Sequence, residues 1–347
     1  MKKILAIALC LVMALGIVSC NAPKEADYKL GMGVVVSMDS SKTGNAQVDA
    51  TVATVVTDAD GKIVLCRIDV AQNKMAVTDG AVDAAKTFET KMELGSRYGM
   101  AGKVDNNGDG VMLEWDAQTK EFEKFVVGMT AAEVKAIKTQ EANGHQIAVD
   151  EALLSAGCTI QITDYIAAVA AACEDEQGVS FKAVAGEFTL GVAAKTSAAD
   201  SKAATAEANG LVAMYSDFAA TVIADGKIIA ALNDAIQPKI TINAAGEIVE
   251  KAFTATKRNL KEAYNMATYG ASQDPNNDGK VLEWYLQSEA FSKHVVGMTG
   301  EQVAAMETAT NSIGYQMTTD ADLLAAGCTI QITAIKAVVA QAAANAR

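Results

Sequence analysis

Two short stretches place oxygen-bearing side chains at alternate positions and end in glycine. The oxygen-bearing residues are Asp105, Asn107 and Asp109 in the first stretch and Asp274, Asn276 and Asp278 in the second. Ca²⁺ takes several oxygen ligands, and alternate side chains converge on one ion only where the chain turns sharply. Gly110 and Gly279 permit such a turn. The two stretches therefore predict one Ca²⁺ site each.

The spacing resembles the opening half of an EF-hand loop, in which a glutamate at the twelfth position completes the coordination. The twelfth positions here are Asp116 and Tyr285, whereas the tenth positions are Glu114 and Glu283. We expect Glu114 and Glu283 to supply the missing carboxylate from the start of the next helix. The alternative is that Asn, Asp and Gly act as ordinary turn residues before that helix.

The two stretches belong to a longer repeat within the chain. Segments of the first copy that recur in order in the second are 113–115 with 282–284, 126–130 with 295–299, and 153–163 with 323–333. Such self-similarity indicates two copies of one domain. We expect repeat domains at 28–177 and 178–347, preceded by a short tether at 20–27.

Each copy begins with segments typical of strands. Apolar runs flank Asp60-Gly61 in the first copy and Asp225-Gly226 in the second, which predicts a hairpin in each. A further short strand is expected at 159–162.

The later part of each copy favours helices. Trp115, Phe122 and Val126 share one helical face, so Trp115 is expected in the core rather than on a ligand. Thr130 and Glu133 fit a capping box, as do Thr299 and Gln302. Helices are also expected at 165–173 and 335–344. The expected class is α+β, with two tandem homologous domains, each an antiparallel β-rich N-terminal part followed by a helical part.

The first residues match a secretory signal peptide. Lys2 and Lys3 precede an apolar run at 4–18, which is short for a membrane span. Residues 17–20, Ile-Val-Ser-Cys, resemble the lipobox of bacterial lipoproteins. That resemblance implies cleavage after residue 19, lipid on Cys20, and anchoring to the outer face of the bacterial cell membrane. Ordinary secretion is the alternative.

Net charge, motifs and cysteines limit the classes of function that we expect. Loss of the signal peptide changes the net charge from −13 to −15, because Lys2 and Lys3 leave with it. So acidic a body repels nucleic acid and suits cation binding or solubility. The sequence contains no catalytic motif of the common hydrolase, metalloprotease or nucleotide-binding types, so we expect no enzyme. Beyond the signal and lipid positions, Cys66, Cys158, Cys173 and Cys328 are either free thiols or include one disulfide.

The turn before the last helix of each copy is a candidate attachment site for a second cofactor. Hairpin, helices, a small-residue turn ending in threonine and an Ala/Val-rich helix follow one another in a layout that resembles the extracytoplasmic FMN-binding domain. The resemblance implies an FMN phosphoester on Thr159 or Thr329 and an electron-transfer role. Ala156 and Cys158 stand where that family has serine and alanine. The alternative is a tight turn around a buried thiol.

The repeat as a whole is more similar to a group of duplicated, largely uncharacterised lipoproteins of anaerobic Gram-positive bacteria. The shared features are the Glu-Trp helix, the Val-Val-Gly-x-Thr corner and the Ala-Gly-Cys-Thr-Ile turn. Three functions remain open: a surface-anchored binding lipoprotein with structural Ca²⁺, a flavin electron carrier, and a structural or adhesive cell-envelope protein. The partner expected is the membrane through Cys20, together with an unidentified small molecule or cell-envelope component.

Overall fold

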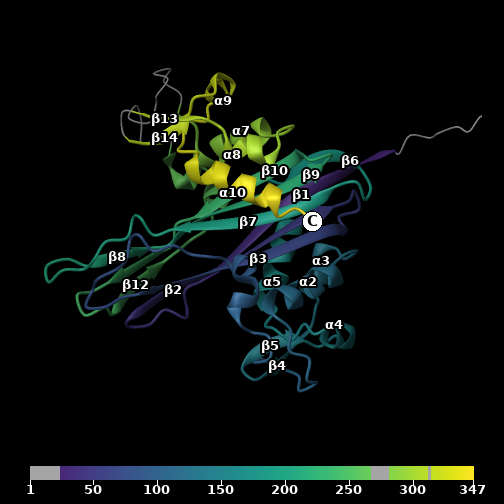
Figure 1. Cartoon of the computed structure of the whole chain (residues 1–347), viewed down its shortest axis with the longest axis horizontal. Helices are drawn as coiled ribbons and strands as arrows, with labels where there is room; N and C mark the ends of the chain where they lie inside the picture. Colours follow the sequence, from purple (N-terminus) through teal and green to yellow (C-terminus); the bar gives the residue numbers. More distant parts are fainter. Residues whose placement is uncertain (1–23, 267–280, 312–313) are drawn as a thin grey trace, which may run out of the picture.

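Two antiparallel sheets lie at the centre of the molecule. The computed structural model describes residues 24–266, 281–311 and 314–347 (Figure 1). We call residues 24–177 the first half and residues 178–347 the second half. The first sheet contains, in spatial order, β3 (Ile63–Ala76), β2 (Asn45–Thr57), β1 (Glu25–Ser37) and β6 (Val179–Val184). The second contains β10 (Lys227–Ile236), β9 (Tyr215–Ala224) and β7 (Thr189–Ser197).

Smaller sheets extend this centre. One contains β12 (Ile248–Ala252), β11 (Lys239–Ile242) and β8 (Gly210–Ala213). The two others are hairpins of β4 (Thr139–Ala142) with β5 (His145–Ala148), and of β13 (Thr308–Thr310) with β14 (Gln316–Thr318).

Helices follow the strands in each half. Those of the first half are α1 (Lys91–Leu94), η1 (Gly95–Tyr98), α2 (Trp115–Phe125), α3 (Ala131–Lys135), α4 (Glu151–Ser155) and α5 (Thr163–Cys173). Those of the second half are α6 (Lys257–Leu260), η2 (Lys261–Tyr264), α7 (Trp284–His294), α8 (Gly300–Ala304), α9 (Ala321–Ala325) and α10 (Thr333–Ala344). The α+β class is therefore confirmed.

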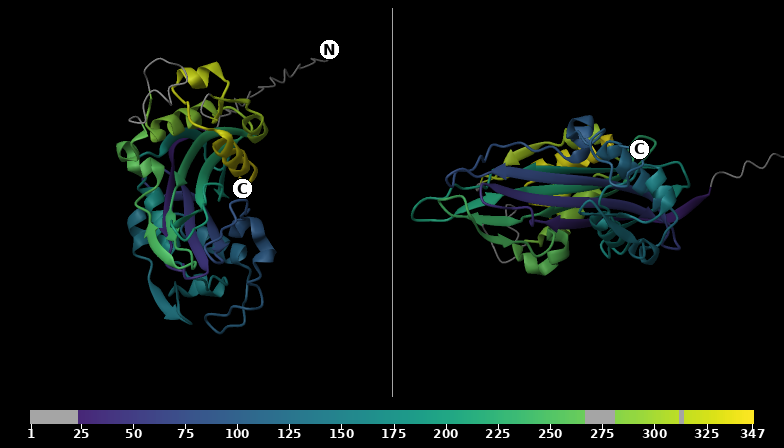
Figure 2. Two further views of the ribbon diagram at one scale, coloured as in Figure 1. Left: turned by 90° about the vertical axis from the view of Figure 1, so that its left-hand side faces the viewer. Right: turned by 90° about the horizontal axis from the view of Figure 1, so that it is seen from below.

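The layers run helix, sheet, sheet, helix. The inner faces of the two sheets share one apolar core, to which Leu30, Leu190 and Phe218 belong. A second core joins the outer face of the first sheet to α2 and α5, and a third joins the second sheet to α7 and α10. Figures 1 and 2 show the helices on the two outer sides of the paired sheets. Because β6 of the second half pairs with β1 of the first, the halves share a sheet as well as a core.

Local signals in the sequence account for several elements. The predicted hairpins are confirmed: Asp225 and Gly226, both with positive φ, form the two-residue turn between β9 and β10. The predicted capping boxes at Thr130 and Thr299 are also present. Trp115 and Trp284 begin helices of equal length and are buried, as expected. The order of elements is similar in the two halves, and descent from one duplicated domain stays a prediction.

The strand expected at 159–162 is wrong. Residues 158–162 form an irregular turn between α4 and α5. Their backbone groups form no strand ladder: Cys158 N donates to Leu153 O of α4, and Thr159 N donates to Gln118 Oε1 at 2.9 Å. Ile162 N makes a single bond to a strand, at Gln146 O of β5. The apolar alternation of this segment places Ile160 and Ile162 in the core without a sheet.

The outer helices approach the sheets closely at glycine. A Cβ atom on Gly191 of β7 would lie 1.9 Å from Ala342 O of α10, and one on Gly33 of β1 would lie 2.1 Å from Ala168 O of α5. Such distances leave no room for a methyl group. These glycines therefore fix how near each helix lies to its sheet.

We expect Gly191→Ala to lower the free energy of unfolding by about 1–3 kcal/mol, because α10 must move away from β7. Urea denaturation measures this change. Lys195→Ala, at an exposed position of the same strand, is the control and should stay within about 0.5 kcal/mol of the unchanged protein. Equal stabilities of the Gly191 variant and the control would contradict this packing.

Candidate functional site

A buried aspartate on β3 positions the start of α1. Asp69 is 2% exposed, and its Oδ1 accepts hydrogen bonds from Val70 N at 2.7 Å and Met92 N at 3.1 Å. The Thr90 side chain also bonds to this carboxylate. Thr90 in turn caps α1 through Glu93 N. Burial raises the pKa of Asp69 to about 6, although these hydrogen bonds oppose the shift.

The arrangement places Lys91 over two aromatic rings. Its Nζ lies 5.0 Å from the ring centroid of Tyr98 and 5.4 Å from that of Trp115. Trp115 is held in turn by its indole N–H, which donates to the Tyr165 hydroxyl at 2.7 Å. Burial lowers the pKa of Lys91, while Asp49, Asp69 and Asp164 partly oppose that shift. The ring faces and the negative charges of these carboxylates therefore stabilise the Lys91 cation.

The second half repeats this geometry. Lys257 Nζ lies 5.1 Å from the Tyr264 centroid and 5.2 Å from the Trp284 centroid. Asp234 on β10 accepts Ala235 N and Arg258 N at the start of α6, as Asp69 does for α1. Lysine over tyrosine and tryptophan is therefore a common feature of both halves.

A polar cleft of about 410 Å³ opens beside Lys91, between the outer face of the first sheet and the helices; we call it the Lys91 cleft. Its charged lining residues are one lysine, Lys91, and two aspartates, Asp49 and Asp164. Its neutral polar lining includes the amides of Gln47, Gln72, Asn106 and Gln161.

One acceptor in this cleft lacks a donor. Asp49 Oδ2 accepts from Gln47 Nε2 at 2.7 Å, whereas Asp49 Oδ1 is buried and receives no hydrogen bond within the described part of the chain. Burial raises the pKa of Asp164, the negative charge of Asp49 raises it further, and Lys91 partly opposes the shift. An unsatisfied buried carboxylate oxygen is costly unless a donor from outside the protein reaches it.

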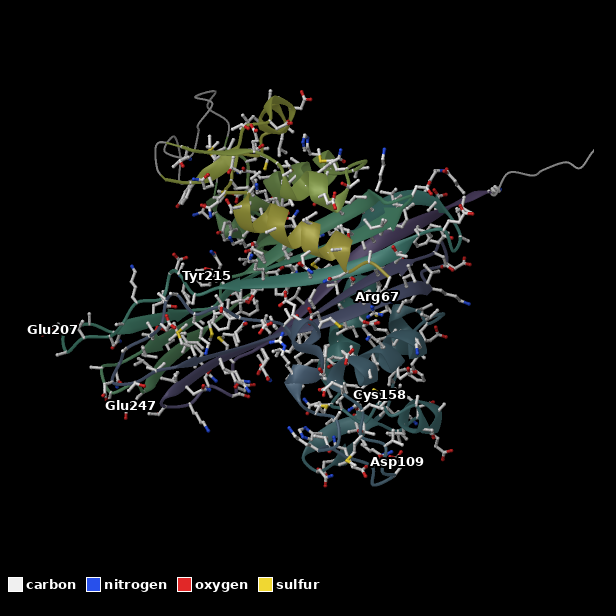
Figure 3. The ribbon with its side chains drawn as sticks, viewed as in Figure 1. Arg67, Asp109, Cys158, Glu207, Tyr215 and Glu247 are labelled. Carbon is white, nitrogen blue, oxygen red and sulfur yellow. The ribbon has the colours of Figure 1, made fainter. Side chains whose placement is uncertain are left out.

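The first predicted calcium stretch forms a closed loop. Asp105 Oδ1 accepts Gly108 N at 2.6 Å, and Asp105 Oδ2 accepts Gly110 N at 3.0 Å. Asn107 Nδ2 donates to Asp109 Oδ2 at 2.8 Å. Figure 3 shows Asp109 at the outer end of the first half's helical layer, away from the sheets.

The glutamates expected to complete the calcium sites accept hydrogen bonds from backbone N–H groups instead. Glu114 accepts hydrogen bonds from Met100 N and Ala101 N, and Glu283 accepts one from Met266 N. No three His, Cys, Asp or Glu side chains gather for a metal ion within residues 24–266, 281–311 and 314–347. The remaining predicted ligands lie outside the described residues; they are Asp274, Asn276 and Asp278. Calcium binding stays a prediction.

The two threonines predicted to carry a flavin contact a buried glutamine. Thr159 N and Oγ1 both lie within hydrogen-bond distance of Gln118 Oε1, at 2.9 and 3.3 Å. Thr329 contacts Gln287 in the same way, at 2.7 and 3.1 Å. A phosphoester on either hydroxyl would have to replace that side-chain contact and, at fully buried Thr159, expose the oxygen. The FMN assignment stays a prediction.

Among the residues that the structure describes, four thiols are free: Cys66, Cys158, Cys173 and Cys328. Burial raises the pKa of Cys158 and of Cys328 to about 12 in each case, so both stay protonated near neutral pH. Cys158, which Figure 3 shows inside the helical part of the first half, is therefore a packing residue.

Sequence reasoning missed Asp49, Asp69, Lys91 and Asp164. A signal was present, because Thr90-Lys91 recurs as Thr256-Lys257 ahead of corresponding short helices. The calcium stretch contributes only Asn106 to the Lys91 cleft, and Asn106 also ties that stretch to the turn by donating to Thr159 O at 2.8 Å.

Searches with protein-family models, among curated proteins and among solved structures find nothing that matches this chain. Within its described residues, none of the helices is both long and apolar enough to cross a membrane. The geometry of the sites therefore carries the functional argument.

We expect Asp69→Asn to flatten the dependence of stability on pH. The folded-state pKa of about 6 lies above the ordinary 3.8, so the folded protein binds this proton more tightly than the unfolded chain. The corresponding stability is present below pH 4 and is lost as pH rises through 6, by about 3 kcal/mol.

Urea unfolding at pH 4 and pH 7 measures this difference. Relative to Asp69→Asn, the unchanged protein should lose stability over that range. The exposed position Asp60, in the turn between β2 and β3, gives a control for net charge as Asp60→Asn. Parallel pH profiles for the unchanged protein and Asp69→Asn would contradict the raised pKa of this buried carboxyl.

Proposed function

We propose that this chain is a non-enzymatic binding lipoprotein displayed outside the cell membrane, and that the Lys91 cleft is its ligand site. The observation that carries the proposal is Asp49, a residue of the cleft lining whose buried Oδ1 receives no hydrogen bond from the residues that the structure describes. A ligand O–H or N–H would satisfy it. The cleft volume of about 410 Å³ falls in the range of small-molecule sites.

The lining supports a small polar ligand with several hydrogen-bond donors. Two carboxylates, Asp49 and Asp164, accept such donors, and the neighbouring amides both donate and accept. The rings of Tyr98 and Trp115 already face the Lys91 ammonium, so the ligand would meet polar groups first. Amines and hydroxyl-rich molecules share this donor chemistry.

Tryptophan fluorescence tests the proposal directly. Trp284→Phe leaves Trp115, at the cleft, as the single reporter. In this background we expect a saturable change with either spermidine or a monosaccharide panel, and a loss of affinity in Asp49→Asn. The loss should be about tenfold or more for an ammonium ligand, because a charged hydrogen bond is removed, and about threefold for a neutral one.

The matched control is Asp217→Asn. Asp217 lies on β9 of the second half, and Lys257 acts on its pKa as Lys91 acts on that of Asp164. Binding at Trp115 should be unchanged in this variant. Absence of any saturable response from both ligand classes, or equal affinities for the unchanged protein and Asp49→Asn, would refute the assignment.

A structural Ca²⁺ at the first acidic loop is a second candidate, favoured by its closed conformation. The Asp105 carboxylate already draws the loop together, and Asn107 and Asp109 lie side by side. A cation there would stabilise the folded protein by mass action. Glu114 would have to leave the backbone of residues 100–101, or water would complete the coordination.

Calcium binding predicts a rise in melting temperature when Ca²⁺ is added to chelator-treated protein, with Mg²⁺ as control. The double variant Asp105→Asn with Asp109→Asn keeps a side-chain oxygen acceptor at each position but removes both negative charges. The rise in melting temperature should therefore shrink. An unchanged melting temperature on adding Ca²⁺ would identify the loop as an ordinary turn.

The anchor and the flavin are tested by one measurement. The mass of the chain purified from its native host should exceed that of residues 20–347 by a lipid on Cys20. A further excess equal to FMN, lost in Thr159→Ala or Thr329→Ala, would instead support the electron-transfer alternative. A mature chain that carries no lipid on Cys20 would contradict anchoring.

A further inference from the structure

The two sheets meet along two edges that differ in how they are filled. At one edge β3 of the first sheet contacts β7 of the second, and at the other β6 contacts β10. We call these the β3–β7 edge and the β6–β10 edge. Each edge lies beside the first long helix of one half, α2 at the β3–β7 edge and α7 at the β6–β10 edge.

Charged side chains close the β3–β7 edge. Glu123 of α2 is 2% exposed, and its Oε1 accepts Ile68 N at 2.9 Å. Arg347 Nη2 donates to both Glu123 oxygens, at 3.1 and 2.8 Å, and Arg67 Nη1 lies 3.7 Å from Oε2. Arg67 also donates to Arg347 O, and Arg347 N donates to Leu190 O of β7. Figure 3 shows Arg67 at this edge, near the C-terminus.

The β6–β10 edge has uncharged side chains at the corresponding places. Glu123 is the ninth residue of α2, and Ser292 is the ninth residue of α7. In the first half, Ile68 contacts Glu123 and Arg67 is the residue before it. In the second half, Asn233 Nδ2 donates to Ser292 Oγ at 2.8 Å, and Leu232 is the residue before Asn233. Where a glutamate and two arginines fill the first edge, the second edge has a cavity of about 460 Å³ lined by Leu232, Asn233 and Ser292.

The chemistry of this cavity favours an uncharged occupant. Its charged lining residues already have counter-charges: Arg258 lies 3.2 Å from Asp175, Lys293 lies 2.5 Å from Glu289, and Glu176 lies 3.8 Å from Lys261. Valine, alanine and leucine form apolar walls, at Val179, Ala231 and Leu232. An ionic ligand would lose its hydration without gaining an unmatched charge.

The buried polar residues of the cavity leave one hydroxyl proton without an acceptor. Asn233 Nδ2 donates to Ser288 O and Ser292 Oγ, and Ser288 Oγ donates to Asn233 Oδ1 at 2.7 Å. Ser292 Oγ only accepts in this network, within the residues that the structure describes. Its O–H is therefore free to donate to a ligand.

We propose that the cavity at the β6–β10 edge binds a small uncharged organic molecule whose hydroxyl or carbonyl oxygen accepts a hydrogen bond from Ser292. The apolar part of the molecule would lie against Val179 and Leu232. This site is separate from the Lys91 cleft, which lies on the outer face of the first sheet in the other half.

Three fluorinated probes of equal shape and different charge test the proposal on the full mature chain. They are 4-fluorobenzyl alcohol, 4-fluorobenzoate and 4-fluorobenzylamine, observed by fluorine NMR. We expect saturable line broadening with the alcohol and affinities about tenfold weaker, or no binding, with the two ions. Ser292→Ala should weaken the alcohol about fivefold, because a neutral hydrogen bond is lost.

A filled cavity gives the decisive comparison. Leu232→Arg with Ser292→Glu copies the side chains of Arg67 and Glu123, and binding of the alcohol should disappear. Circular dichroism confirms folding of this variant, and Ser292→Ala, which removes only an oxygen, gives a second reading if the double variant does not fold. Asp49→Asn, in the other cleft, should leave binding unchanged.

Four results would overturn the proposal. They are no saturable binding of the alcohol to the unchanged chain, equal binding of the alcohol and the ions, undiminished binding to the folded double variant, and undiminished binding to Ser292→Ala. Because the probes and variants differ from those for the Lys91 cleft, failure at one site leaves the result at the other site intact.

Discussion

The burial of both faces of each central sheet is the constraint on which the rest of the structure depends. In β2, eleven of the thirteen residues are buried, as the burial pattern of this strand records. A strand of this kind needs apolar cover on two sides. The other sheet covers the inner face and the helices cover the outer face, so neither half can complete its own core. The shared sheet, in which β6 pairs with β1, follows the same logic.

Two apolar layers leave few places for polar groups, and those places are where the sites arise. Asp69 and Asp234 lie on strands whose outer faces are covered by helices, and each carboxylate accepts backbone N–H groups at the start of a short helix. That interaction sets the positions of Lys91 and Lys257 above their aromatic rings. Burial raises the pKa of Asp69, so keeping its carboxylate ionised in this position costs the folded protein free energy at neutral pH. Such a cost is typical of residues that orient a site.

Local rules explain what the sequence predicts well. Turn residues at Asp225-Gly226, capping boxes at Thr130 and Thr299, and the apolar faces that begin at Trp115 and Trp284 depend on neighbours within a few positions. The irregular turn at Thr159 depends on Gln118, about forty positions earlier, and no local pattern indicates that contact. The pairing of β6 with β1 spans a still larger separation. Three separate elements bring Asp49, Lys91 and Asp164 to one cleft. No single sequence motif therefore contains all three residues.

The two halves have similar elements, but the edges at which their sheets meet differ. One edge is filled by charged side chains and the other contains a cavity. At the β3–β7 edge, two guanidinium groups balance a carboxylate that would otherwise be buried alone, and each partner needs the others. Loss of one charge there would leave an unpaired ion, whereas replacement of the whole set by neutral residues leaves a hydrogen-bonded cavity. Leu232, Asn233 and Ser292 form such a neutral set at the β6–β10 edge. The cavity therefore needs no separate scaffold: it lies where the same two sheets meet beside the corresponding helix, α7, without the charged residues that close the opposite edge beside α2.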